Sequence, residues 1–94
     1  MSGRIVIAGD SVPSLPNHVR LRQDPRRGWV VLAPERVLIP DEIAVEILLR
    51  CDGKSTVDEI AASLAQEFSA PEDEIRKDVI GALQNLADKG FLGA

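Results

Sequence analysis

The hydrophobic pattern of the chain changes its period at Pro40, and this change limits the possible fold more than any other feature. Residues 19–39 contain short β-rich runs broken by turn residues, whereas from residue 41 onward apolar residues recur every three or four positions. The first pattern is typical of half-buried strands and the second of amphipathic helices. Strands followed by helices in separate blocks predict an α+β domain.

Three short strands are predicted before Pro40. Residues 19–22 alternate apolar and charged side chains, and residues 29–32 form a second β-rich run after the turn-forming residues 24–28. A third run covers residues 36–39, and Pro34 separates it from the second because proline cannot donate to a sheet ladder. We expect these runs to form a three-stranded antiparallel sheet.

Three helices are predicted after Pro40. Asp41 is the expected N-cap of the first helix, which should end at Asp52 and Gly53. Its apolar face is expected to hold Ile43, Ala44, Ile47, Leu48 and Cys51.

The second and third helices carry clear start and stop signals. Thr56 and Glu59 have the spacing of a capping box, in which each side chain accepts a free backbone N–H of the other residue. The third helix is predicted to begin near Pro71, among acids that favour the positive end of a helix dipole. Gly90 should end it, with Phe91 and the following leucine folding back onto the core.

This order of elements predicts a winged helix-turn-helix-like domain over residues 18–94, with a three-stranded antiparallel sheet followed by a three-helix bundle. Residues 1–17 lack a useful periodicity and contain Pro13 and Pro16. We therefore expect a flexible N-terminal tail or linker before the domain.

Residues suited to catalysis and metal binding are scarce. The chain has one histidine and one cysteine, and His18 and Cys51 cannot supply the three or four ligands of a zinc site. Cys51 also falls on the buried side of the first predicted helix, which suits an unreactive core thiol. The sequence predicts no enzymatic activity, no metal and no cofactor. Because it has no long apolar run and permits no internal disulfide, we also expect no membrane contact and a cytoplasmic location.

The charge distribution argues against the nucleic-acid binding that winged helix domains often perform. Residues 1–40 hold six arginines and three acids, whereas residues 41–94 hold five basic residues and twelve acids. The third helix, which would enter the major groove, carries more acids than bases. Phosphate neutralisation dominates nucleic-acid affinity, so we expect no nucleic-acid partner.

The third predicted helix has an apolar arc of about 160°, wider than one core face requires. Ile75, Val79, Ala82 and Leu86 make a sufficient core face, which leaves a flank of Arg76, Ile80, Leu83 and Ala87. This flank either packs under another part of the chain or forms the wall of a groove. The third strand, if it lies at the sheet edge, could accept an added peptide strand beside that wall.

Several segments together resemble the PqqD family of pyrroloquinoline quinone (PQQ) biosynthesis proteins. The similarity covers about residues 19–92, and the order and spacing of its pieces make it specific. The matching residues are 29–36, Ile47, Leu48, 51–60, 74–79, Leu83, Leu86 and 90–92.

The resemblance implies a non-catalytic peptide chaperone, a recognition element for ribosomally made and modified peptides. Family members bind the precursor peptide PqqA and present it to PqqE, a radical S-adenosylmethionine enzyme that cross-links a Glu and a Tyr of the precursor. The implied fold has three strands and three helices, with the peptide added beside the third strand and packed against the third helix. Residues 1–17 lie outside the similarity, and their composition is also compatible with a fusion to a neighbouring pathway enzyme.

Carried over by position, the resemblance and the helical wheel together give one set of candidate peptide-binding residues. The binding edge corresponds to the third strand, and the helix wall corresponds to the helix that holds Asp78, Val79 and Leu83. The choice of Arg76, Ile80, Leu83 and Ala87 as the exposed wall comes from the helical wheel. The full set is Arg36, Val37, Leu38, Ile39, Arg76, Val79, Ile80, Leu83 and Ala87.

Three alternatives to this function remain open from the sequence. The chain could recognise the precursor of a different ribosomal peptide pathway, with the same binding physics. It could be a winged-helix transcriptional regulator, which the acidic third helix disfavours. Its groove and edge strand could instead serve homodimerisation.

Overall fold

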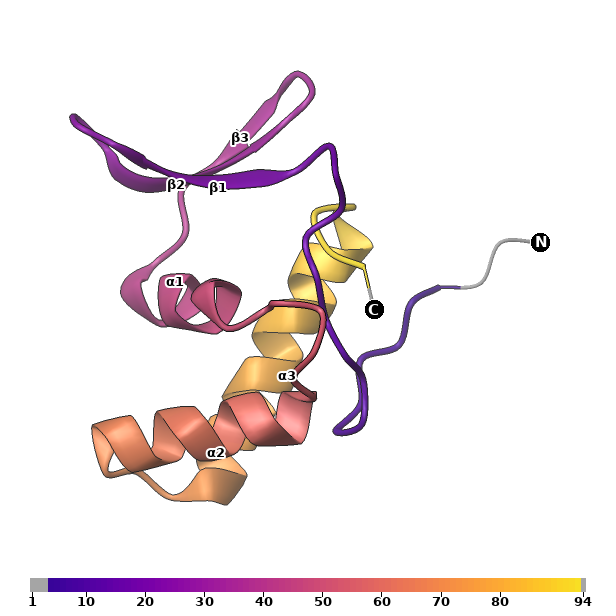
Figure 1. The fold of residues 1–94 in the computed structure, drawn as a ribbon, viewed down its shortest axis with the longest axis vertical. Helices are drawn as coiled ribbons and strands as arrows, with labels where there is room; N and C mark the ends of the chain where they lie inside the picture. Colours follow the sequence, from indigo (N-terminus) through magenta and orange to yellow (C-terminus); the bar gives the residue numbers. More distant parts are fainter. Residues whose placement is uncertain (1–3, 94) are drawn as a thin grey trace.

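A computed structural model describes residues 4–93 and places a small sheet above three helices (Figure 1). The elements follow the order that the sequence predicts, which confirms the α+β class and the strand-then-helix arrangement. They are β1 (Arg20–Asp24), β2 (Gly28–Ala33), β3 (Arg36–Leu38), α1 (Glu42–Leu49), α2 (Val57–Phe68) and α3 (Glu72–Asp88).

The sheet is antiparallel with the order β1-β2-β3, so β3 is an edge strand. Val31 of β2 lies opposite Leu38 of β3 on the face toward the helices, and Val31 is fully buried. Val30 lies opposite Arg22 of β1, and both belong to the outer face because successive side chains alternate across a strand. The sheet therefore has one core face and one face turned away from the helices.

The helix starts follow the caps that the sequence predicts. The Asp41 carboxylate accepts the backbone N–H of Ala44 at 2.8 Å, which begins α1. The capping box of α2 is complete, since Thr56 Oγ1 accepts from the Glu59 backbone at 3.1 Å and Glu59 Oε1 accepts from the Thr56 backbone at 2.8 Å. These contacts satisfy N–H groups that have no partner within the helix.

One hydrophobic core joins the sheet to all three helices. Its most buried side chains come from β2, α1, α2 and α3: Val31, Ile47, Val57, Ile60, Val79 and Leu83. Phe91 and Leu92 fold back onto this core as predicted, and Gly90 takes a positive φ of 82° where α3 ends. Ile43, which the sequence places on the apolar face of the first helix, is instead 49% exposed.

The N-terminal segment, defined here as residues 4–17, packs against the helices, whereas the sequence predicts a flexible tail or linker over residues 1–17, of which 1–3 lie outside the described residues. Ile7 is 5% exposed within the core, and Pro13 is fully buried. The backbone carbonyls of Gly9 and Ser11 accept the N–H groups of Asp58 and Val57 at the start of α2. The composition suggested a tail, but these contacts make residues 4–17 part of the domain.

A single side chain of α3 holds the beginning of this segment. Gln84 Oε1 accepts the backbone N–H of Ile7 at 2.8 Å, and Gln84 Nε2 donates to the carbonyl of Ile5 at 2.7 Å. Arg4 adds two hydrogen bonds to the Asp88 carboxylate. The segment thus lies along α3, as Figure 1 also shows.

Within residues 4–93, no helix combines the length and the apolar character that a membrane crossing requires.

Candidate functional site

The free edge of the sheet offers backbone groups for a further strand. Pro34 and Glu35 form a two-residue turn between β2 and β3, with Glu35 at a positive φ of 62° and Ala33 directly opposite Arg36. In such hairpins the pair that flanks the turn exchanges backbone hydrogen bonds, and the bonding direction alternates along the strand. The backbone groups of Arg36 and Leu38 therefore face β2, whereas those of Val37 face the open edge.

A groove lies between the end of β3, the start of α1 and the middle of α3. The hollow has a volume of about 390 Å³. Its strand side is formed by Leu38 and Ile39, and its α3 side by Gly81, Ala82 and Asn85. Ile39 is 61% exposed, so an apolar side chain borders the groove without a partner in the described chain. An edge strand and an adjoining groove on α3 are the two parts needed to hold an extended peptide.

Two of the four predicted edge residues, Val37 and Ile39, have exposed side chains. Val37 is 53% exposed and Ile39 61%, while Leu38 is half-buried and turns its side chain toward the core. The side chain of Arg36 contacts the end of α3 within the domain. Its guanidinium donates to the carbonyl of Lys89 at 2.5 Å and lies 4.4 Å from the centre of the Phe91 ring. Arg36 thus fixes β3 to the end of α3 through a cation–π contact and a hydrogen bond.

The expected wall on α3 lies elsewhere on the helix. Leu83 is fully buried and Val79 is 1% exposed, so both are core residues and not an exposed flank. The buried face of α3 is Val79, Leu83 and Leu86. Compared with the face expected from the helical wheel, the helix is rotated so that Ala82 leaves the core centre and borders the groove.

The other three wall positions lie on the side of α3 that carries the N-terminal segment. Arg76 forms an ion pair with Asp58 of α2 at 2.7 Å, directly beside Gly9. Ile80 and Ala87 pack against the core on the same side as Gln84, which binds Ile5 and Ile7. The wide apolar arc of α3 is therefore explained by two contacts, one with the core and one with the N-terminal segment. This agrees with the alternative in which the flank packs under another part of the chain.

Sequence reasoning missed Gly81, Ala82 and Asn85 as groove residues. Gly81 lies in the middle of a helix, where glycine costs about 1 kcal/mol relative to alanine. A Cβ added to Gly81 would meet nothing within 4 Å, so packing inside the domain does not require the glycine. The sequence signal that could have indicated the groove was Gly81 next to Ala82, because two small residues in a helix allow a ligand backbone to approach closely.

Two ionisable groups outside the groove lining, Cys51 and Asp88, have pKa values shifted by their surroundings. Burial raises the pKa of the Cys51 thiol to about 12, and its Sγ donates to the carbonyl of Ile47 at 3.2 Å. The Arg4 guanidinium beside Asp88 lowers the pKa of that carboxyl. Among residues 4–93, no three His, Cys, Asp or Glu side chains lie together as metal ligands. The site can bind through shape and backbone hydrogen bonds.

Comparison with known families gives a match over most of this domain. Residues 28–92 match the family model described as coenzyme PQQ synthesis protein D (PqqD). A protein of Rhodopseudomonas palustris strain TIE-1 named PqqA binding protein is 56% identical over 90 residues, covering 95% of this chain and 88% of its own length. A PqqA binding protein of Rhizobium meliloti is 47% identical, covering 93% of this chain and 90% of its own.

Solved structures agree with the fold. The PqqD part of Methylobacterium extorquens PqqCD, a functional stand-alone recognition element for ribosomally synthesised and modified peptides, matches with a TM-score of 0.82 and 42% identity, covering 94% of this chain and 95% of that one. PqqD from Xanthomonas campestris matches with a TM-score of 0.62 and 44% identity, covering 94% and 99%. Lasso peptide synthetase B1, solved with a leader peptide, shares the fold at a TM-score of 0.77 and 16% identity, covering 89% and 100%.

Proposed function

The chain belongs to the PqqD family, and from that premise we propose that it binds the precursor peptide PqqA by adding it as a strand beside β3. Peptide binding in PQQ biosynthesis is supported by relatives named PqqA binding protein, two of which are 56% and 53% identical to this chain. The observation that carries the proposed mode is the open edge at Val37 next to a groove of about 390 Å³.

The bound peptide would pair its backbone with Val37 and, if pairing continues, with Ile39. Side chains on one face of the added strand would enter the groove against Ala82 and Asn85 of α3. Backbone hydrogen bonds give such complexes their affinity, and the pockets for alternate side chains give them their specificity. We therefore assign the site to Val37, Leu38, Ile39, Gly81, Ala82 and Asn85, and leave Arg36 and the buried α3 residues a supporting role.

The role is delivery and not chemistry. Holding one part of a flexible precursor as a strand removes part of the entropy that a modifying enzyme would otherwise have to overcome. It also raises the effective concentration of the free part of the peptide at the enzyme. We propose PqqE as the enzyme that receives the peptide, and the cytoplasm, where ribosomal peptides are made, as the place. A binding role is also in keeping with Cys51, whose thiol is buried with its pKa raised to about 12.

A nuclear magnetic resonance titration of the ¹⁵N-labelled chain with synthetic PqqA tests the proposal. We expect amide shifts concentrated at residues 37–39 and 81–86, with the amides of the N-terminal segment unchanged. A peptide of the same composition in scrambled order is the control. Saturating PqqA that leaves the 37–39 amides unmoved, or that moves them no more than the scrambled peptide, would refute strand addition at this edge.

The groove residues have a matched test of their own. Gly81→Leu places a large side chain in the hollow, whereas Gly81→Ala changes the same residue without filling it. We expect Gly81→Leu to weaken PqqA binding at least about tenfold relative to Gly81→Ala, because the peptide would lose the close approach to α3. Equal affinities for the two variants would remove α3 from the site.

A further inference from the structure

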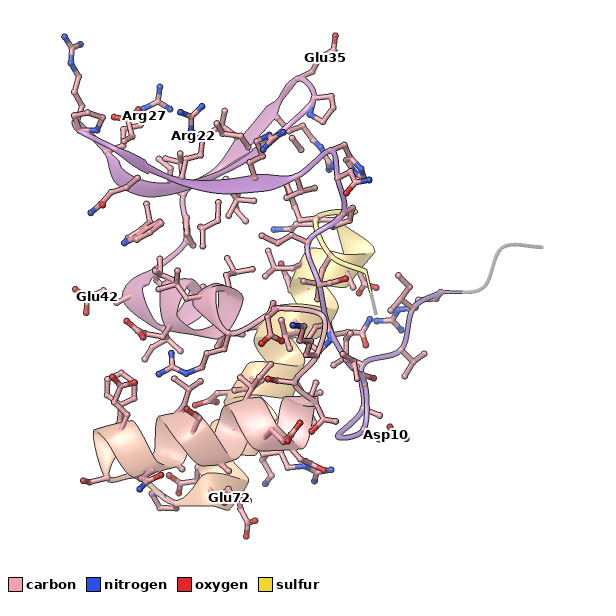
Figure 2. The ribbon with its side chains drawn as sticks, viewed as in Figure 1. Asp10, Arg22, Arg27, Glu35, Glu42 and Glu72 are labelled. Atoms are coloured by element: carbon pink, nitrogen blue, oxygen red, sulfur yellow. The ribbon has the colours of Figure 1, made fainter. Side chains whose placement is uncertain are left out.

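The outer face of the sheet combines arginines with an apolar floor. Strand register places Arg20 opposite Leu32 and Arg22 opposite Val30, and Leu32 opposite Val37 of β3. Because opposed residues share a face, these five residues lie on the side away from the helices. Figure 2 shows Arg22 and Arg27 on that side, with the labelled acids Glu42, Glu72 and Asp10 on the helical side.

These arginines are not engaged in ion pairs. Within residues 4–93, the recorded ion pairs use Arg4, Arg50 and Arg76, all of which meet carboxylates on the helices. Asp24, which borders the outer face, accepts the backbone N–H groups of Arg26 and Arg27, and these bonds, with the charge of Arg27, lower its pKa. Its carboxylate therefore shapes the β1–β2 turn, and Arg20, Arg22 and Arg27 keep their charged groups exposed.

The face is hollowed and not flat. A depression of about 310 Å³ has an apolar part formed by Val30, Leu32 and Val37 and a polar part formed by Arg22, Arg27, Asp24, Gln23 and the turn at Pro25. Val30 is only 3% exposed although no layer of the domain covers this face, so the arginine stems that line the depression shield it. Val37, by contrast, is 53% exposed at its rim. Guanidinium groups above an apolar floor suit an extended segment in which carboxylates alternate with small apolar side chains.

We propose that the outer face of the sheet is a second docking surface, distinct from the groove beside α3, and that it binds a carboxylate-rich segment of a partner protein. The charge of the face selects such a segment, because Arg20, Arg22 and Arg27 form none of the ion pairs recorded within residues 4–93 and outnumber Asp24, the acid that borders the depression. The accessible apolar side chains select a protein segment over a nucleic acid, because a phosphate backbone has no apolar groups to bury on Leu32 and Val37. The acidic helical half would also repel a nucleic acid.

A protein segment is also favoured over a second copy of this chain. The acids of a second copy are spread over three helices, and their contact with the basic face would be head-to-tail and would not close into a dimer. The two surfaces of the sheet share β3, since Leu38 borders the groove and Val37 the outer face. A peptide at the edge and a partner segment on the outer face could then be held side by side on one strand. This use rests on the proposed function, whereas the docking itself does not.

The test uses an alternating Glu-Ala peptide as the probe and a Gln-Ala peptide as its neutral control. The resonances of the arginine Nε–H groups report the outer face directly, and the amides of residues 81–86 report the groove. We expect the Glu-Ala peptide to shift the Nε–H signals of Arg20, Arg22 and Arg27 and to bind several-fold more weakly when the ionic strength rises from about 0.05 to about 0.3 M. The Gln-Ala peptide should leave these signals in place.

Matched variants separate this face from charge in general. Arg20→Gln/Arg22→Gln/Arg27→Gln removes three charges from the face, and Lys54→Gln/Lys77→Gln/Lys89→Gln removes the same number from the helical half. We expect the arginine variant to lose about tenfold in affinity for the Glu-Ala peptide and the lysine variant to lose less than twofold. Both should keep the amide spectrum of a folded domain, since all six side chains are exposed.

Four results would overturn the proposal. Equal loss in the two variants would reduce the effect to net charge, and shifts confined to residues 37–39 and 81–86 would assign the probe to the groove. Tighter binding of a single-stranded DNA oligonucleotide than of the Glu-Ala peptide would assign the face to nucleic acid. Self-association that vanishes in the arginine variant would assign it to a second copy. Failure of PqqA to bind the edge would leave the docking result intact, so the two proposals fail separately.

Discussion

Replacing Val37 with proline tests the backbone geometry of the edge strand. The turn at residues 34–35 and the opposition of Ala33 and Arg36 direct the Val37 N–H away from β2. Proline has no N–H, but at this position no hydrogen bond of the sheet is lost, and proline is tolerated on edge strands for that reason. The fold should survive, while an added peptide strand would lose one backbone donor.

The size of the effect follows from the number of donors. β3 ends at Leu38, so Val37 supplies the one outward N–H within the strand, and Ile39 continues the alternation just beyond it. Losing one bond and leaving a peptide carbonyl without a partner costs about 1–3 kcal/mol. This corresponds to about 5- to 150-fold weaker PqqA binding, since about 1.4 kcal/mol is a factor of ten. Isothermal titration calorimetry with synthetic PqqA measures it.

Two controls make the result interpretable. Val37→Ala keeps the N–H and removes most of the side chain, so it isolates the contribution of the backbone. Leu38→Pro removes a donor that faces β2 and should lower the free energy of unfolding, because it breaks a bond of the sheet. If Val37→Pro bound PqqA as tightly as Val37→Ala, or if Leu38→Pro left stability unchanged, the assignment of outward groups would be wrong.

Three further predictions concern α3, the N-terminal segment and the core. Gly81→Ala should raise the free energy of unfolding by about 0.5–1 kcal/mol in urea denaturation, because the open space at Gly81 accepts a Cβ and helix interiors disfavour glycine. A decrease would show that the glycine is needed by the free domain. Gln84→Ala should cost about 1–3 kcal/mol through its bonds to Ile5 and Ile7. Amide exchange at Ile7 should accelerate by more than at Ile60, and equal acceleration would mean that the segment is not held separately. The Cys51 thiol, whose pKa is raised to about 12, should keep its proton in the folded chain at a pH where the unfolded chain loses it. Because the unfolded state then binds fewer protons, this thiol's contribution to stability is complete below about pH 8.5 and is lost as the pH rises toward about 12. The difference in unfolding free energy between the chain and Cys51→Ala should shrink over that range, and a constant difference would contradict the raised pKa.

Local signals in the sequence were sufficient for the elements and their ends. The Asp41 cap, the Thr56–Glu59 capping box and the return of Phe91 are each set within a few residues, so their geometry was predictable. The strands differ from expectation by one or two residues at their ends. The edge position of β3 was predictable because strands joined by short turns pair with their neighbours in the sequence, which leaves the third strand at the edge.

The face of α3 that lines the groove depended on a contact far away in the sequence. A helical wheel can find a wide apolar arc but cannot say which segment covers which part of it. The sequence of residues 4–17 indicates a linker because it has the pattern of neither a helix nor a strand. Two of these residues, Ile7 and Pro13, are nevertheless buried. Once this segment covers the side of Gln84, the groove must lie on the opposite side, at Ala82 and Asn85.

The shortness of β3 has a consequence for how long a peptide stays bound. A strand of three residues can form few backbone hydrogen bonds with a peptide, so these bonds contribute only about 1–3 kcal/mol to the binding free energy. Side chains in the groove must supply the remaining binding free energy. Differences in affinity between related complexes lie mostly in the dissociation rate, and a short ladder makes that rate fast. A short β3 therefore favours faster release of a bound peptide than a long, fully paired edge strand would.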